Sequence, residues 1–167
     1  RFGTITSAIE LLLKTHRRPM HFRALYNELC KWRKPNFTTP AVHNILLHSD
    51  HTALWGRGIY IHDAFIPNAK EVVTKVEHWL LDALASHIPC VSVSKSFRHF
   101  QHLCTEHGIP TEQALYSCLR KSQHHMIAYP RYPYIYRYKR GLKHIPLPII
   151  LEDWLREAGE PIPLAQI

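Results

Sequence analysis

Glycine is scarce in this chain, with only six among 167 residues. None of them belongs to a glycine-rich loop of the kind that cradles phosphates, and neither a GxSxG nor an HExxH motif occurs. The carboxylates are scattered rather than gathered as a two-metal nuclease requires. We therefore expect a protein that is not an enzyme, needs no cofactor and has no catalytic residues.

Long apolar runs and paired cysteines are missing as well. No stretch of about 18 apolar residues could span a bilayer, and no signal peptide opens the chain. The four cysteines are widely spaced, without a CxxC pair, which favours buried thiols over disulfides. We therefore expect no membrane partner and an intracellular, reducing compartment: the bacterial cytoplasm or nucleoid, or the eukaryotic nucleus.

Histidine is abundant, but its spacing does not suit a metal. His99, His102, Cys104 and His107 fall within one expected helix. His99 and His102 are three positions apart and share a face, whereas Cys104 lies five positions beyond His99 and points elsewhere. Four tetrahedral ligands cannot come from this helix, so we expect no metal site.

Positive charge dominates the first six-sevenths of the chain. The 21 Lys and Arg residues exceed the 13 Asp and Glu residues, which gives a net charge of +8 with neutral histidines. Residues 1–64 hold nine basic and four acidic side chains, residues 65–144 hold eleven and five, and residues 145–167 hold one and four. A polyanion is the expected partner of such a surface.

Apolar periodicity predicts three helices and a hairpin within the segment 1–66. Thr38 or Thr39 is expected to cap the third helix, with Pro40 in its first turn. Two alternating stretches on either side of Gly56-Arg57-Gly58 predict the hairpin. This order is typical of a winged helix-turn-helix domain. The first two helices are expected over residues 8–16 and 22–32, the third from Pro40 onward, and the strands over 52–55 and 59–62.

The same order of elements returns in the second part of the chain. When the two parts are aligned on their third helices, Thr38 falls on Thr111. Allowing one further residue in the hairpin places Arg57 on Arg131. These matches fall on a cap position and on the hairpin tip, as a duplicated fold predicts. The helices are expected over residues 71–87, 96–108 and 112–122, and the strands over 90–94, 125–129 and 134–138.

A third copy is expected to begin near the end of the chain, where Ile9 aligns with Leu151 and Pro19 with Pro161. Because the chain also opens on Arg1 rather than Met, we expect a fragment of a longer protein. The predicted fold class is mainly α with small β-hairpins, an α+β protein of tandem winged helix-turn-helix domains. The expected units are 1–66, 67–144 and a truncated third repeat over 145–167.

Candidate DNA contacts follow from this fold, because its third helix enters the major groove and its hairpin reaches the backbone or the minor groove. Threonine suits phosphates, asparagine suits adenine edges, and arginine suits guanine, phosphates or a narrow minor groove. The expected DNA-binding residues of the first unit are Thr38, Thr39, His43, Asn44 and Arg57, with Arg33 and Lys34 as phosphate contacts. Those of the second unit are Thr111, Gln113, Tyr116 and Arg131, with Arg137, Lys139 and Arg140.

Each of these contacts has a structural alternative. Thr39 and Thr111 can cap helices whatever the function. Arg57 and Arg131 can be solvated hairpin tips, and Asn44 can be an ordinary surface residue. The tyrosines that alternate with arginine near the last strands suit base stacking, yet alternation along a strand buries about half of them. The fold is therefore a stronger inference than any single contact.

Several residues of the first unit form a known pattern: Pro19, Leu25-Tyr26, Leu29, Thr39-Pro40, Gly56-Arg57-Gly58 and Tyr60. In this pattern residues 4–62 resemble the HARE-HTH winged-helix family. The second unit resembles only a generic winged helix, because Pro130 and Tyr132 replace two of the glycines. The resemblance implies association with DNA in chromatin, transcription or restriction-related proteins, including a winged-helix subunit of bacterial RNA polymerase.

Three hypotheses for the function follow. The first is a non-enzymatic tandem winged-helix module that binds duplex DNA, in transcription regulation or in a restriction or defence protein. The second is a protein-interaction scaffold that binds RNA polymerase, chromatin proteins or other domains of a larger parent protein. The third is an enzyme such as a nuclease, whose active site would lie outside this fragment.

Overall fold

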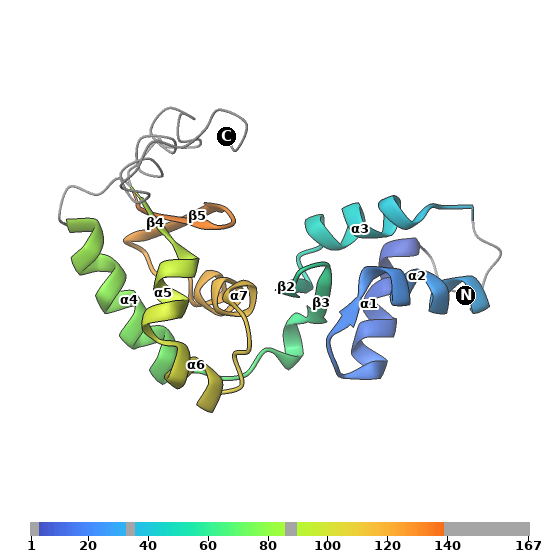
Figure 1. Ribbon diagram of the computed structural model, residues 1–167. Helices are drawn as coiled ribbons and strands as arrows, with labels where there is room; N and C mark the ends of the chain where they lie inside the picture. Colours follow the sequence, from blue (N-terminus) through green and yellow to red (C-terminus); the bar gives the residue numbers. More distant parts are fainter. Residues whose placement is uncertain (1–3, 33–35, 86–89, 139–167) are drawn as a thin grey trace, which may run out of the picture.

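Helices flank two small antiparallel sheets in the computed structural model, which describes residues 4–32, 36–85 and 90–138 (Figure 1). For Pro130 and Arg131 it describes the backbone alone. The expectation of a mainly α, α+β protein with small hairpins is confirmed. The expected third repeat, residues 145–167, lies outside the described residues.

The first unit has the predicted order of elements. Thr4 and Thr38 cap its first and third helices, each accepting a hydrogen bond from a backbone amide three residues on. Its three strands form an antiparallel sheet in the order β1-β3-β2. The elements are α1 (Ile5–His16), β1 (Met20–His21), α2 (Phe22–Trp32), α3 (Thr39–His48), β2 (Thr52–Gly56), β3 (Ile59–His62) and the short helix η1 (Asp63–Phe65).

The second unit repeats this order, except that two short helices stand where the first unit has α2. Ser92 caps the earlier one by accepting a hydrogen bond from the amide of Ser94, so the strand ends sooner than the predicted residue 94. The predicted helix over 96–108 is divided at Phe100. The elements are α4 (Lys70–Ala85), β4 (Cys90–Ser92), α5 (Val93–His99), α6 (Gln101–Glu106), α7 (Glu112–Ser122), β5 (Ile127–Arg131) and β6 (Tyr134–Arg137), with sheet order β4-β6-β5.

A hydrogen bond between a serine and a glutamate is repeated in both units. Ser49 donates its hydroxyl hydrogen to Glu10 at 2.9 Å, and Ser122 donates to Glu77 in the same way. Each bond ties the first helix of its unit to the end of the third. Glu10 and Glu77 therefore have the same structural role in the two units.

The backbone pairing of the two hairpins corrects one predicted correspondence. The amide of Phe22 donates to the carbonyl of Gly58, and the amide of Val93 donates to the carbonyl of Pro133 in the same way. Pro133 is thus the counterpart of Gly58, and Tyr132, rather than Arg131, takes the place of Arg57. The predicted equivalence of Arg57 and Arg131 is wrong by one residue.

The one-residue error in the predicted equivalence arises from the segment between the third helix and the hairpin of each unit. After the equivalent serines Ser49 and Ser122, this segment spans residues 50–51 in the first unit and 123–126 in the second. The longer segment moves the second hairpin further along the sequence than an alignment on core residues predicts.

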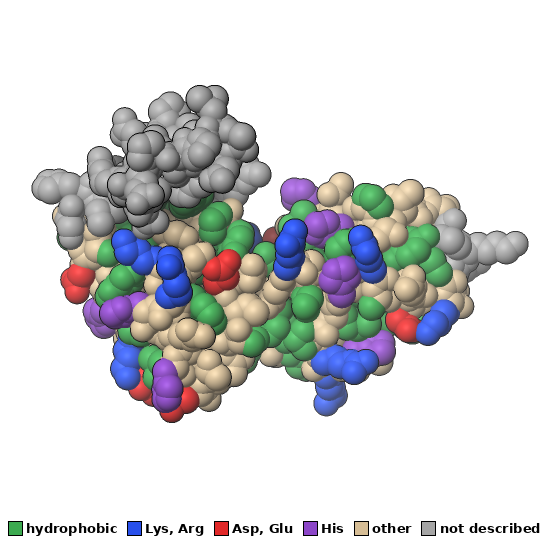
Figure 2. All heavy atoms as spheres, in the orientation of Figure 1, with side chains coloured by type: hydrophobic (Ala, Val, Ile, Leu, Met, Phe, Trp, Pro, Cys, Tyr) green, Lys and Arg blue, Asp and Glu red, His purple; other side chains and the backbone are tan. Residues whose placement is uncertain are grey.

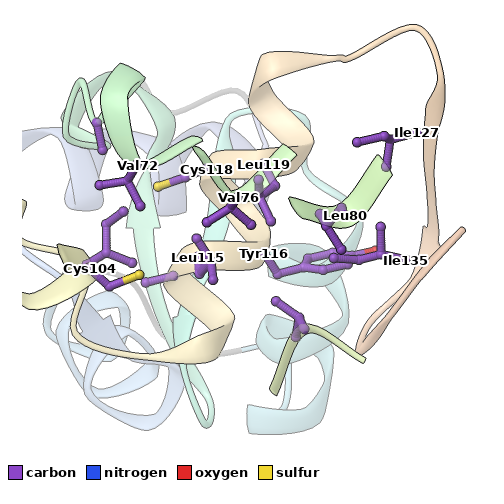
Figure 3. Close-up of a cluster of buried hydrophobic side chains, with 14 of the residues drawn as sticks. Val72, Val76, Leu80, Cys104, Leu115, Tyr116, Cys118, Leu119, Ile127 and Ile135 are labelled. Atoms are coloured by element: carbon purple, nitrogen blue, oxygen red, sulfur yellow. The ribbon is translucent and has the colours of Figure 1, made fainter. Parts of the chain in front are cut away.

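The sheet of the first unit is covered on both faces. Tyr60 points into a first core built by α1, α2 and α3, whereas its neighbour Ile61 belongs to a second core together with Trp55. Strand alternation explains this division, because successive side chains point to opposite faces. Half of the buried residues of the second core come from α4 and α7, where Val72, Val76, Leu80, Leu115 and Leu119 lie together (Figure 3).

Helix α7 packs across β2 and joins the two units. The hydroxyl of Thr111 donates to the carbonyl of Trp55 at 2.6 Å, and that of Ser117 donates to the carbonyl of Leu54 at 2.7 Å. Lys121 donates to the carbonyl of Asp63 at 2.8 Å. The predicted boundary between residues 66 and 67 falls between η1 and α4, but the second core crosses it.

Candidate nucleic-acid interface

Helix α3 exposes one face and buries the other. Val42 and Leu46 point into the first core, while Asn44 and the capping residue Thr38 are exposed. Thr39 and His43 are half-buried between these two faces. Of the residues predicted on this helix, Asn44 and Thr38 are therefore the most accessible to a ligand.

A stack of rings connects α3 to the hairpin. The imidazole of His43 lies parallel to the ring of Phe22, with centroids 4.5 Å apart, and His21 packs on the same phenylalanine at 4.5 Å. The amide of Phe22 donates to the carbonyl of Gly58 at 3.0 Å. The start of α2, the side of α3 and the tip of the hairpin thus form one continuous surface.

Two residues of this surface were missed by the sequence analysis. His21 ends β1 beside the hairpin, and the guanidinium of Arg23 lies 5.9 Å from the centre of the Phe22 ring. This distance is within the range of a cation–π contact. The signal was the alternation of basic and aromatic residues over 21–23, where β1 ends and α2 begins.

Arg57 stands at the exposed tip of the hairpin. No ion pair within residues 4–32, 36–85 and 90–138 involves this side chain. Its charge is therefore available to an anion. We call the surface formed by His21, Arg23, His43, Asn44 and Arg57 the hairpin surface. In Figure 2, Lys, Arg and His side chains gather over α3 and the adjoining sheet.

Gly58 shapes the hairpin surface through its backbone conformation. Its φ of +69° lies in the left-handed region, and a Cβ there would be 2.9 Å from Nε2 of His21 and 3.0 Å from the ring of Phe22. We expect Gly58→Ala to lower the free energy of unfolding by about 2–3 kcal/mol, from the left-handed conformation and the overlap together. Urea denaturation followed by circular dichroism measures this change.

Gly56 provides the matched control for that substitution. A Cβ on Gly56 would lie at an ordinary 3.4 Å from Ile59, and its φ is not positive. Gly56→Ala is therefore expected to cost less than about 1 kcal/mol. Equal effects of the two alanine substitutions would contradict the role assigned to Gly58.

In the second unit, α7 is occupied by contacts within the protein. Residues 114–119 are all buried, and Tyr116 is only 6% exposed, with its hydroxyl donating to the carbonyl of Tyr129. Thr111 both caps α7 and donates to Trp55, while Gln113 donates to the hydroxyl of Tyr132. The structure therefore argues against Thr111, Gln113 and Tyr116 as DNA contacts.

The remaining predicted contacts are basic residues outside α3 and α7. Arg137 is exposed at the end of β6. The side chain of Arg131 lies outside the part of the chain that the structure describes. The same is true of Arg33, Lys34, Lys139 and Arg140, so their contribution stays a prediction.

Within the described residues, no group of three His, Cys, Asp or Glu side chains is arranged to hold a metal ion. Burial raises the pKa of the Cys104 thiol to about 11 and that of Cys118 to about 12, so both are protonated at neutral pH. None of the described helices combines the length and the apolar character needed to cross a bilayer.

Comparisons with known proteins add no relative. No family model, curated protein or solved structure matches this chain. The resemblance to the HARE-HTH family thus rests on the sequence pattern, whose residues serve mainly structural roles. Leu25, Leu29 and Tyr60 are core residues, Pro40 stands in the first turn of α3, and Gly58 has the positive φ of the hairpin.

Proposed function

We propose that the chain is a non-enzymatic pair of winged helix-turn-helix units that binds duplex DNA through the hairpin surface of the first unit. The order helix, strand, helix, helix, strand, strand and the sheet order β1-β3-β2 support the winged-helix assignment. The net charge of +8 supports a polyanionic partner.

One observation carries the proposal: Arg57, exposed at the hairpin tip, shares a continuous surface with the third helix of its unit. In this arrangement α3 enters the major groove, with Asn44 near the base edges, and Arg57 reaches a phosphate or the minor groove. His21 and Arg23 lie between α3 and the hairpin tip, and they contact the DNA backbone that separates the two grooves.

The second unit has a different part in this proposal. Because α7 is buried against β2, the equivalent helix of the second unit does not enter a groove. Its cap, Thr111, instead holds the carbonyl of Trp55, two residues before Arg57. The second unit thereby braces the hairpin that contacts DNA.

Reversing the charge of Arg57 tests the proposal. Arg57→Glu removes one phosphate or groove contact and adds a like charge, so we expect about a tenfold or greater loss of affinity for a duplex of about 20 base pairs at low salt. Fluorescence anisotropy at low and at physiological salt measures it. Lys14→Glu, an equal charge change at an exposed position of α1, is the control. The proposal fails if wild type shows no binding below about 100 μM at low salt, or if both variants bind alike.

The second candidate is a protein-interaction scaffold, with RNA polymerase or other domains of a larger protein as partners. It is favoured by Leu11 and Leu47, which are 43% and 51% exposed on α1 and α3. Leu11→Ser separates the two functions in pull-downs and in the anisotropy assay, because Leu11 is on α1 and not on the helix proposed to enter the major groove. A scaffold loses its partner in pull-downs and binds no DNA, whereas a DNA-binding module keeps its affinity within about twofold.

A further inference from the structure

An open cavity lies on α4 and α5 of the second unit. Its volume is about 560 Å³, and Trp79, Lys95, Arg98 and His99 line it. The last three are exposed and follow one another at positions i, i+3 and i+4 of α5, so they share one face of the helix. None of the described residues that line the cavity is acidic. We call these four residues the α5 cluster.

Aromatic contacts hold the α5 cluster in place. The imidazole of His99 stacks on the indole of Trp79, with centroids 5.3 Å apart and ring planes 20° from parallel. The ring of Phe100 meets both edge-on, at 6.1 Å from Trp79 and 4.7 Å from His99. Arg98 Nε donates to the carbonyl of Ser94 at 3.4 Å. The imidazole of His99 and the guanidinium of Arg98 therefore lose little freedom when they bind a ligand.

The chemistry of the cluster suits a phosphate that belongs to a polymer. Lys95 and Arg98 supply charged donors, and arginine matches the geometry of phosphate oxygens. A site for a free small molecule encloses most of its ligand, whereas this cavity is open to solvent. A phosphate that is held in place by the rest of a nucleic-acid strand does not need such enclosure.

The α5 cluster lies in a unit whose third helix is buried, yet basic side chains are exposed on both units, with single acidic side chains between them. Figure 2 shows Lys, Arg and His side chains over α4 and α5 and again over α3 and the adjoining sheet, on the same face of the molecule. A duplex on the hairpin surface would extend over this face. DNA rises about 3.4 Å per base pair, so one helical turn spans about 35 Å.

We propose that the α5 cluster is a second phosphate-binding site, which holds the sugar–phosphate backbone of the duplex bound at the hairpin surface. This inference rests on the proposed function, because the hairpin surface positions the duplex. The chain then covers a longer stretch of DNA than the first unit does alone.

Duplex length tests this site. The double variant Lys95→Gln with Arg98→Gln is compared with wild type on duplexes of about 8 and about 24 base pairs. We expect unchanged affinity for the short duplex and about a tenfold loss for the long one at low salt. The slope of log affinity against log salt should fall by about 1.8 on the long duplex, since each lost phosphate contact removes about 0.9.

The controls separate this site from the proposed function. Lys14→Gln with Arg120→Gln removes the same charge outside the cavity and should leave the affinity for both duplexes unchanged. Circular dichroism checks that each variant folds.

Equal losses on the two duplexes, no loss on either, or tighter binding of a single strand of the long length would overturn the α5 site. The proposed function would still stand if Arg57→Glu weakened binding of the short duplex. Wild type that binds neither duplex would overturn both.

Discussion

Replacing Trp55 with alanine is expected to lower the free energy of unfolding by about 3–5 kcal/mol, the cost of truncating a large buried aromatic residue. Trp55 belongs to a hairpin strand of the first unit, but its side chain is 7% exposed and fills the core of the second. Urea denaturation followed by far-ultraviolet circular dichroism measures the loss. The substitution keeps the Trp55 carbonyl, so the hydrogen bond from Thr111 does not enter the difference.

Trp32 is the matched control for Trp55. It is 48% exposed at the end of α2, so Trp32→Ala is expected to cost less than about 1.5 kcal/mol. A similar loss for both substitutions, or a loss below about 1 kcal/mol for Trp55→Ala, would contradict the shared core.

Cooperative unfolding is the corollary of the shared core. Because β3 contributes Tyr60 to one core and Ile61 to the other, neither unit can unfold without exposing apolar surface of its neighbour. We expect a single unfolding transition with the same midpoint by circular dichroism and by tyrosine absorbance. Two separated transitions would show that the units are independent.

Raising the pH above about 9 is expected to destabilise the fold steeply. Burial raises the pKa of Cys118 from 9.0 to about 12 and that of Cys104 from 9.0 to about 11. It also raises the pKa of Tyr60 and of Tyr116 from 10.0 to about 12. Above each unfolded pKa the unfolded chain loses protons that the folded chain keeps, so stability falls as pH rises.

The window of this loss follows from the same values. The stabilising effect of the two thiols is complete below about pH 9, and that of the tyrosines below about pH 10. Above its unfolded pKa, each group lowers the free energy of unfolding by about 1.4 kcal/mol per pH unit, until the pH reaches its folded pKa. Urea midpoints measured between pH 8 and about pH 12 test this prediction.

The cysteines can be separated from the tyrosines in that experiment. Between about pH 9 and pH 10 the two thiols dominate the loss, so Cys104→Ala with Cys118→Ala should flatten the pH dependence there. Tyr60→Phe should reduce the slope above about pH 10 instead. Stability that stays constant up to about pH 11 would contradict the burial of these groups.

The brace formed by α7 connects stability to the proposed function. Thr111 and Ser117 hold the backbone of β2 on one side, and the Phe22 amide holds Gly58 on the other. The hairpin that carries Arg57 is thus fixed at both flanks rather than free in solvent. If the hairpin surface binds DNA as proposed, a substitution in the second unit is expected to weaken that binding without changing a residue of the hairpin surface.

The order of elements, the cap at Thr111 and the hairpin tip at Arg57 could be predicted from the sequence, which narrowed the cap of the third helix to Thr38 or Thr39. These features depend on neighbouring residues: a threonine hydroxyl reaches an amide three residues on, and helical or alternating periodicity shows within a short window. The coarse fold class follows from the same local signals. The repeat itself could also be seen, because it preserves caps and core positions.

Only the tertiary structure decided which of these elements face solvent. Residues 112–122 resemble a helix with an accessible side, yet Tyr116, Ser117 and Cys118 are buried, since α7 packs on a sheet from the other unit. The hydrogen bonds that fix this packing join residues 56 and 63 positions apart. The ring stack of His21, Phe22 and His43 and the α5 cluster are likewise made across separate elements. Local periodicity holds no information on such pairings, because they depend on how whole helices and sheets cover one another.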